Sequence, residues 1–270
     1  MKRLAPGSFF GEVRRRWTLN EFTFVESEYD SGIEIPIHCH ARPFLYFVLD
    51  GVCTEVCDGN RRTLEAMTLV FHPAGSSHSD CWHGGAGRCF SIEIPQSSLS
   101  IAGNTLDHSI IFPTAKAIGL VACLYREFRV PDELSPLATD GLVWELLGEA
   151  AALRKHRPDG KPPRWLRQVL DLLHDRFAEA LQLSDIAGSV GIHPMHLSRT
   201  FRRHIGCSVG QYIRDLRLGF AARQLRGSCK AIVHIALDSG FSDHSHFTNT
   251  FTRRVGITPA GFRRHLYHSA

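Results

Sequence analysis

The sequence predicts an α+β protein of two domains, in which a β-barrel with accessory helices precedes an all-α domain. Short runs of β-branched and aromatic residues, separated by turn-forming residues, fill residues 22–94 and are typical of a barrel or jelly roll. From about residue 105 the apolar residues recur at helical spacing. The last third contains an internal repeat, which predicts a duplicated helical unit. A length of 270 residues also suits two domains.

Five runs of apolar, β-branched or aromatic residues predict the strands of the barrel. Turn-forming residues separate these runs, and Asp58-Gly59-Asn60 is typical of a tight hairpin turn. The predicted strands are residues 22–25, 44–48, 52–57, 68–71 and 89–94.

Two stretches after the barrel, residues 114–128 and 137–154, carry the helical apolar pattern. Their apolar residues could pack on the barrel as monomer core, or they could leave an exposed face that forms a dimer seam. The polar, proline-rich residues that follow predict an interdomain linker. The predicted domains are a barrel (1–104), a helical segment (105–157), a linker (158–163) and a helical domain (164–270).

The last third contains two copies of one pattern, Leu183–Tyr212 and Ile232–Phe262. Gly191 matches Gly240 at an offset of 49, and later positions match at an offset of 50. Two copies are too few for a solenoid, which needs about three repeats, so we expect a paired module. The pairs at the larger offset are Leu197/Phe247, Phe201/Phe251, Gly206/Gly256, Ser208/Thr258 and Tyr212/Phe262.

Each copy has the parts of a helix-turn-helix. In the first copy Ser184 is expected to cap a short helix, and Gly191 permits the tight turn that follows. Pro194 suits the start of the second helix, on which Leu197 and Phe201 share a buried face. The opposite faces carry side chains that can contact base edges or phosphates, namely Met195, His196, Arg199, Arg202 and Arg203 in the first copy and Ser245, His246, Asn249, Thr252 and Arg253 in the second.

Charge is distributed unevenly between the two predicted domains. Residues 164–270 hold 15 Lys and Arg against 7 Asp and Glu, whereas residues 1–163 hold 16 against 20. The basic half therefore favours a polyanionic partner. The alternative is that its polar faces are solvated surfaces of an ordinary helical domain. The matched positions in two copies favour DNA, because two recognition helices would suit major-groove segments about 34 Å apart.

Residues 164–270 resemble the DNA-binding domain of AraC/XylS-type transcriptional regulators. The motifs that carry the resemblance are Leu183–Ala187, His196–Arg199, Gly240–Asp243 and Gly256–Pro259. The resemblance implies a sequence-specific DNA-binding regulator, not an enzyme, that is controlled by a small-molecule effector or a metal in its N-terminal domain. It also implies a homodimer, contact with RNA polymerase if the protein is an activator, and a linker helix at residues 212–227.

The N-terminal domain resembles the cupin fold. Gly32, His38-Cys39-His40, Gly51 and the stretch from Pro73 to His78 carry this resemblance. In cupins two closely spaced histidines, a glutamate and a later histidine bind a divalent metal inside the barrel. His38, His40 and His78 match the histidines, whereas the glutamate position falls at Phe44 and Met67 replaces a glycine.

The three histidines leave several interpretations open. Three imidazoles could hold Zn or Fe, but the missing carboxylate means that a bound metal is not expected. They could instead hydrogen-bond an effector in a pocket, or be satisfied structural residues. A cupin enzyme such as a metal dioxygenase, fused to a nucleic-acid module, is a second functional class. The sequence shows no further acid–base constellation near these histidines to support it.

Five cysteines fall in the predicted barrel, and Cys53 and Cys57 would share a strand face with Glu55. Such thiolates could sense redox state or a soft metal, although free cysteine is also a common core residue. The five are Cys39, Cys53, Cys57, Cys81 and Cys89.

The sequence also bears on location. It contains no apolar run long enough to cross a membrane, and its first residues lack the apolar core of a signal peptide. We therefore expect a cytoplasmic protein with reduced thiols.

Overall fold

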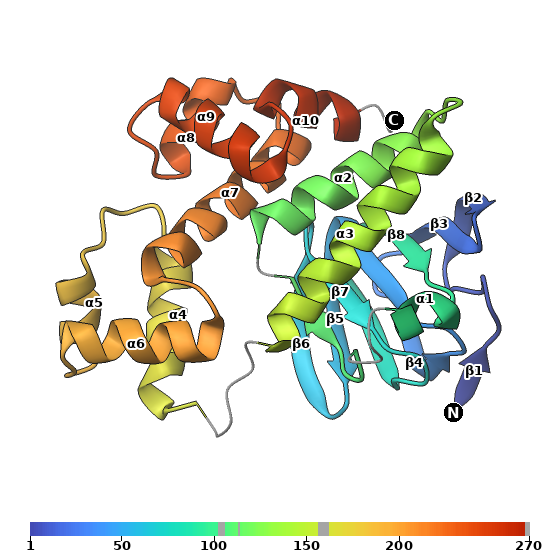
Figure 1. Cartoon of the computed structure of the whole chain (residues 1–270), viewed down its shortest axis with the longest axis horizontal. Coiled ribbons are helices and arrows are strands. Elements are labelled where there is room, and N and C mark those ends of the chain that lie inside the picture. Colours follow the sequence, from blue (N-terminus) through green and yellow to red (C-terminus); the bar gives the residue numbers. More distant parts are fainter. Residues whose placement is uncertain (102–105, 113, 156–161, 268–270) are drawn as a thin grey trace. The chain divides into compact units, whose positions relative to one another are not determined.

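The computed structural model describes residues 1–101, 106–112, 114–155 and 162–267. The chain divides into two compact units, Met1–Phe112 with Leu120–Ala151 and Pro113–Gly119 with Ala152–Ala270 (Figure 1). Residues 158–161 of the predicted linker and the predicted boundary at residues 104 and 105 lie outside the described residues.

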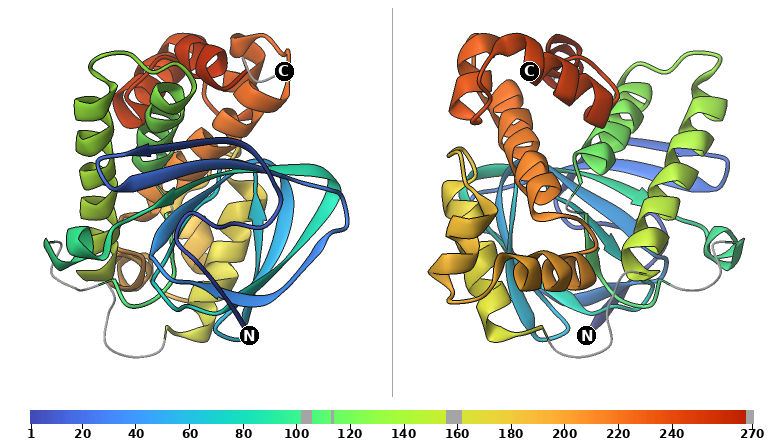
Figure 2. Two further views of the ribbon diagram at one scale, coloured as in Figure 1. Left: turned by 90° about the vertical axis from the view of Figure 1, so that its right-hand side faces the viewer. Right: turned by 60° about the vertical axis from the view of Figure 1, so that its left-hand side comes forward.

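The first unit is built on a curled sheet with its helices beside it (Figure 2). The strand order is β1-β4-β8-β5-β7-β9, with β3 between β2 and β8 and with β6 paired to β5. The α+β prediction is confirmed at this level, as a curled sheet followed by a helical domain. The described strands are β1 (Lys2–Leu4), β2 (Glu12–Leu19), β3 (Phe22–Tyr29), β4 (Glu34–His40), β5 (Phe44–Cys57), β6 (Asn60–Glu65), β7 (Leu69–His72), β8 (His78–Glu93) and β9 (Ile110–Ile111).

The hairpin prediction is confirmed between β5 and β6. Cys57 pairs with Asn60, which leaves a two-residue loop of Asp58 and Gly59. Both loop residues have positive φ, 50° and 76°, as a type I′ turn requires. This turn aligns Cys53 with Leu64 across the two strands, where both side chains are buried.

Two predicted strands, residues 44–48 and 52–57, are one strand in the structure. The turn signal Asp50-Gly51 does not end β5, because Gly51 adopts φ 83° and the register with β8 shifts on either side of Asp50. A β-bulge therefore absorbs the glycine without reversing the chain. Strand β2, which the sequence analysis missed, has mostly exposed or half-exposed residues and so lacks the apolar signal of a buried strand.

Helices α2 (Ala115–Arg129) and α3 (Ser135–Lys155) match the two predicted helical stretches, and α1 (Gln96–Ile101) precedes them. Phe128 of α2 packs on Phe24 and Phe90 of the sheet. Leu137 of α3 is 76% exposed, so this helix has both buried and open apolar positions. Four apolar α3 residues are buried, namely Val143, Leu146, Leu147 and Ala150.

The second unit contains the two helix-turn-helix copies, joined by α7 (Figure 1). The prediction that Ser184 caps the first short helix is wrong. The backbone is extended at Gln182 and the helix begins at Leu183, so Ser184 lies inside the first turn. The helices are α4 (Arg164–Arg176), α5 (Leu183–Ser189), α6 (Pro194–Ile205), α7 (Val209–Gly227), α8 (Ile232–Asp238), α9 (His244–Val255) and α10 (Pro259–Tyr267).

Candidate nucleic-acid interface and sensor pocket

Helices α6 and α9 occupy equivalent places in the two copies and begin at side-chain caps. His193 accepts a hydrogen bond through Nδ1 from the backbone N–H of Met195, at 3.2 Å. Asp243 accepts one from the backbone N–H of His246, at 2.7 Å. Each cap satisfies one of the amide groups that a helix N-terminus leaves without an intrahelical partner. Neither capping residue was predicted as such from the sequence.

Both helices end in the same way. Gly206 follows α6 with φ 84°, and Gly256 follows α9 with φ 87°; each donates its N–H to a carbonyl four residues earlier. Glycine adopts this left-handed conformation without the steric cost of a Cβ. The repeat therefore fixes both ends of each second helix, and the two helices have the same length of 12 residues.

One face of each helix is buried, and it is the face that the sequence predicts. Leu197 and Phe201 of α6 are completely buried, as are Phe247 and Phe251 of α9. The burial of these apolar side chains holds each helix in a fixed rotation about its axis, which decides the side chains that remain outside.

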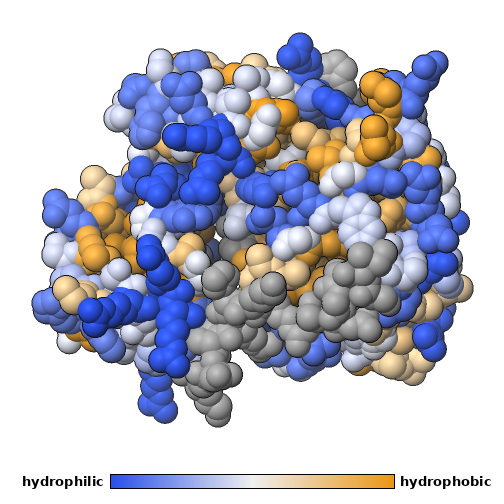
Figure 3. All heavy atoms as spheres, in the orientation of Figure 1, coloured by the Kyte–Doolittle hydropathy of each residue, from blue (hydrophilic) through white to orange (hydrophobic). Residues whose placement is uncertain are grey.

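Nine of the ten residues predicted to contact DNA are exposed. The exception is Thr252, which is half-buried and whose buried hydroxyl has no hydrogen-bond partner within the described part of the chain. Hydrophilic side chains gather over the C-terminal helices in Figure 3. The exposed residues are Met195, His196, Arg199, Arg202 and Arg203 on α6, and Ser245, His246, Asn249 and Arg253 on α9.

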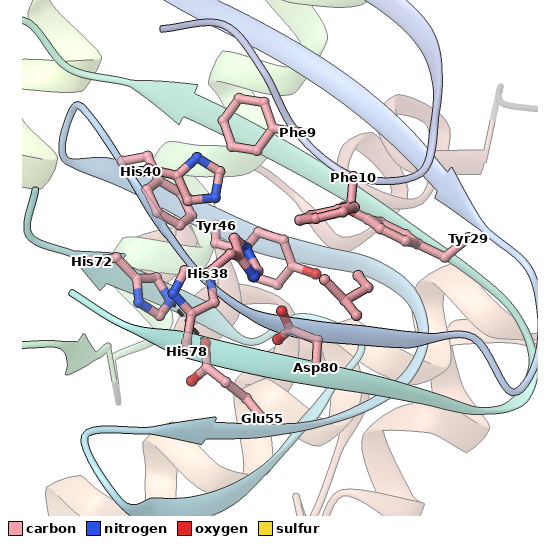
Figure 4. Close-up of a pocket in the computed structure, with 12 residues that line it drawn as sticks. Phe9, Phe10, Tyr29, His38, His40, Tyr46, Glu55, His72, His78 and Asp80 are labelled. Carbon is pink, nitrogen blue, oxygen red and sulfur yellow. Dashed lines mark ion pairs between the residues drawn. The ribbon is translucent and has the colours of Figure 1, made fainter. Parts of the chain in front are cut away.

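A second candidate site lies inside the curled sheet (Figure 4). His38 and His40 lie on β4, and His78 begins β8 directly opposite His38 in the strand register. All three side chains are buried, and each offers a nitrogen within 4.8 Å of the nitrogens of the others. The structure therefore brings together the three histidines that the sequence singled out.

Burial keeps these imidazoles neutral. Desolvation lowers the pKa of His40 to about 2 and that of His78 to about 3, with smaller contributions from the neighbouring histidines. Desolvation also lowers the pKa of His38. Neutral imidazole is the form that can donate a lone pair to a metal or accept a hydrogen bond from a ligand.

Backbone carbonyls orient two of the rings. His38 Nδ1 lies 2.9 Å from the carbonyl oxygen of Pro36, and His78 Nδ1 lies 3.3 Å from that of Ser76. Because a carbonyl can only accept, both Nδ1 atoms carry the proton and both Nε2 atoms keep a free lone pair. His40 Nδ1 is buried without a hydrogen-bond partner in the described residues. These donors fit a divalent cation.

An ion pair that the sequence analysis missed lies at the base of the pocket. His72 Nε2 is 3.0 Å from Glu55 Oε1, both side chains are almost fully buried, and Arg62 also pairs with Glu55. Burial opposes charge on His72, but hydrogen bonds with Cys57 and Glu55 outweigh it and raise the pKa to about 9. The positions were visible in the sequence, but only the strand pairing brings them together.

Aromatic side chains narrow the pocket. Phe44, at the position of the cupin glutamate, lies 4.3 Å from His40 and 4.8 Å from His72 between ring centroids. Phe9 packs on His40 and Phe10 on His38 (Figure 4). The cavity that remains is about 20 Å³, which is room for one water or one ion.

The cysteines do not join the histidines in a metal-binding group within the described residues. Desolvation raises the pKa of the Cys53 and Cys89 thiols, which are buried core groups. Cys57 differs: burial opposes ionisation, but hydrogen bonds from His72, Ser109 and Ser76 outweigh it and lower its pKa.

Comparisons with known proteins agree with the helix-turn-helix geometry. A family model described as a helix-turn-helix domain matches residues 186–265. The probable transcription factor PqrA of Proteus vulgaris is 39% identical over 85 residues, which cover 32% of this chain and 70% of that protein. The transcriptional activator RhaR of Yersinia pestis is 30% identical over 164 residues, 57% of this chain and 54% of RhaR.

The chain therefore belongs to the AraC/XylS-type family of transcriptional regulators, which are not enzymes. It spans about half the length of the RhaR relatives that it matches.

Two solved structures are also similar. ToxT of Vibrio cholerae, with a bound unsaturated fatty acid, has a TM-score of 0.40 and 12% identity, covering 95% of this chain and 99% of ToxT. An AraC-type regulator of Chromobacterium violaceum has a TM-score of 0.37 and 32% identity, covering 39% and 95%. Among the described helices, none combines the length and the apolar character needed to cross a bilayer.

Proposed function

We propose that this protein regulates transcription by binding DNA sequence-specifically through α6 and α9. The supporting observation is that the two copies bury the same apolar positions and expose polar or cationic side chains at three equivalent positions, His196/His246, Arg199/Asn249 and Arg203/Arg253. A solvated helix face need not repeat in this way. The basic balance of residues 164–270 supports a polyanionic partner.

Selection of binding sites from a random duplex library by the full-length protein tests this proposal. The expected result is one enriched motif with two blocks about one helical turn apart. Binding to that motif should weaken as salt rises, because phosphate contacts release counterions. Arg202→Ala or Arg203→Ala should reduce the salt slope by about one unit, whereas Arg61→Ala, an exposed arginine of the other unit, should not. Enrichment of no motif would contradict the proposal.

We also propose that the curled sheet is a cupin-like sensor domain whose effector site contains His38, His40 and His78. The three neutral imidazoles and the small cavity favour a single divalent cation or a compact hydrogen-bonding ligand. A larger molecule would have to displace Phe9 and Phe10. With Phe44 at the position of the cupin glutamate, no carboxylate of the described residues joins the three histidines as a ligand, which weakens the case for a permanent metal.

Titration of the chelator-treated full-length protein with Zn²⁺ tests the cation. The expected result, if the site is used, is one binding event that His78→Ala abolishes and that His83→Ala, an exposed histidine of the same strand, retains. Uptake that is unchanged in His78→Ala would place the ion elsewhere.

The proposed regulator is a homodimer in the cytoplasm that would contact RNA polymerase if it is an activator. The exposed apolar residues of α3, which include Leu137 and Trp144, favour this helix as the dimer contact. The buried residues of the same helix support the monomer-core alternative for its other face. Sedimentation of wild type and Leu137→Glu distinguishes the two, because the charge should dissociate a dimer built on this face.

A further inference from the structure

One arginine in the middle of α7 joins the two helix-turn-helix copies. Arg217 donates from Nε to the carbonyl oxygen of Phe177, at 2.8 Å, and from Nη2 to that of Glu179, at 2.8 Å. Its third donor, Nη1, binds the carbonyl oxygen of Gly240 at 2.6 Å. The first two carbonyls directly follow α4, which packs in the first copy, whereas Gly240 is the turn of the second copy.

The shape of the guanidinium makes these contacts restrictive. Its donors form a rigid planar fork and carry a permanent charge, so three simultaneous bonds fix both its position and its plane. Arg217 is half-buried, and its guanidinium carbon lies 6.0 Å from the ring centroid of Phe241. Phe177, which directly follows α4, packs on Phe220 of α7, with ring centroids 5.3 Å apart. The end of α4 is thus held against α7 from two sides.

The turn glycines show that only the second copy packs its turn against the end of α4. Gly191 and Gly240 are equivalent and both have positive φ, 68° and 82°. A Cβ added at Gly191 would meet nothing within 4 Å, whereas one added at Gly240 would collide with the carbonyl group of Ala178. The second turn therefore packs directly against the end of α4, beside the carbonyls that Arg217 binds.

We propose that Arg217 is a positioning residue that fixes the spacing and rotational phase between α6 and α9, and so sets the separation of the two operator blocks that the protein accepts. This inference rests on the proposed DNA-binding function. A single α7 helix of 19 residues joins the copies. Bending or rotation at its ends would otherwise let α9 follow a displaced block.

The expected sensitivity follows from DNA geometry. One base pair inserted between the blocks moves the second block by about 3.4 Å and turns it by about 35° around the axis. If α6 and α9 are held rigidly, they cannot follow both changes, and one of the two helices loses contacts with its block. If α6 and α9 are joined only by α7, their separation can adjust to the altered spacing, but the protein then binds the native spacing more weakly.

The experiment measures the affinities of the full-length protein for the selected operator and for versions with one base pair inserted or removed between the blocks. Wild type should lose affinity by about tenfold or more at either altered spacing. Arg217→Met, which removes the donors and keeps an unbranched apolar stem, should reduce that ratio to about twofold or less. Arg214→Met removes the same charge from an exposed position of α7 and should keep the wild-type ratio.

A second pair of variants is independent of Arg217 itself. Gly240→Ala should lower the spacing ratio as Arg217→Met does, because its Cβ would push the turn away from the end of α4. Gly191→Ala imposes the same kind of backbone strain in open space and serves as the matched control. This pair also decides the question if Arg217→Met does not fold.

The outcomes separate the inference from the proposed function. Wild-type protein that selects no operator removes the DNA-binding proposal. Wild type with a clear spacing preference that Arg217→Met retains, even with uniformly weaker binding, overturns the positioning role. The positioning role is supported if the ratio of affinities for native and altered spacing falls in Arg217→Met and Gly240→Ala and is unchanged in Arg214→Met and Gly191→Ala.

Discussion

Arg199 and Asn249 occupy equivalent exposed positions on α6 and α9 but differ in chemistry. Arginine makes a bidentate contact with guanine and asparagine with adenine in the major groove. We therefore expect Arg199→Ala and Asn249→Ala each to relax selectivity at one base position, in different blocks of the operator. The loss should be about 1–3 kcal/mol for the preferred base.

Competition binding with point-mutated operators checks this prediction. Each variant should lose preference at its own position and keep it at the other. Equal losses on cognate and scrambled DNA would show that the side chain does not read a base.

The buried pair of His72 and Glu55 predicts a pH dependence of stability. The pKa of His72 is raised from 6.5 to about 9, so its stabilising contribution is complete below pH 6.5 and is lost as the pH rises through 9. For Glu55, burial opposes the shift, but hydrogen bonding and charge interactions with His72 and Arg62 lower the pKa from 4.5 to about 2. Its contribution is therefore complete above pH 4.5 and is lost as the pH falls toward 2.

Glu55→Gln isolates this pair. The difference in the free energy of unfolding between wild type and Glu55→Gln should be largest between about pH 4.5 and 6.5 and should shrink toward pH 9, because Glu55 is one cause of the raised pKa of His72. Urea unfolding at a series of pH values measures it. A difference that is constant from pH 6 to pH 9 would show that His72 carries no proton in the folded protein.

At the scale of elements, α6 and α9 both begin at a side-chain cap, but the capping residues differ in chemistry. Asp243→Ala removes the carboxylate that accepts from the backbone N–H of His246 and should lower the melting temperature. Gln182→Ala is the matched control, because Gln182 occupies the N-cap of α5 without a side-chain cap bond. Thermal unfolding compares the two, and equal shifts would mean that the Asp243 cap contributes nothing specific.

Prediction succeeded for elements whose signal is local. Residues 114–128 and 137–154 became α2 and α3 with nearly the same bounds. The prediction missed β2, because this strand lacks an apolar pattern of its own and is recognisable only by its pairing with β3.

At the scale of the whole molecule, the proposed effector site and the proposed DNA interface belong to different units. If an effector controls DNA binding, the coupling is reciprocal. A ligand of the His38–His40–His78 pocket should change operator affinity by about 5–150-fold, and operator DNA should change the affinity for that ligand by the same factor. Calorimetric titrations measure ligand affinity with and without operator, and operator affinity with and without ligand. Unequal changes in the two affinities would contradict simple linkage.

The sequence by itself determined the duplicated helix-turn-helix and the exposed faces of its second helices. These depend on local signals, namely turn glycines and apolar residues four apart, which act within a few residues of chain. The resemblance to the cupin motifs also singled out the three pocket histidines, although His78 lies 38 residues after His40.

Only the tertiary structure decided what surrounds those residues. His72 meets Glu55, Phe9 and Phe10 narrow the pocket, and Arg217 binds the carbonyls that follow α4 and the turn at Gly240. These partners lie 17 to 40 residues apart in the chain. Contacts at such separations depend on strand pairing and helix packing, which leave no periodic trace in the sequence.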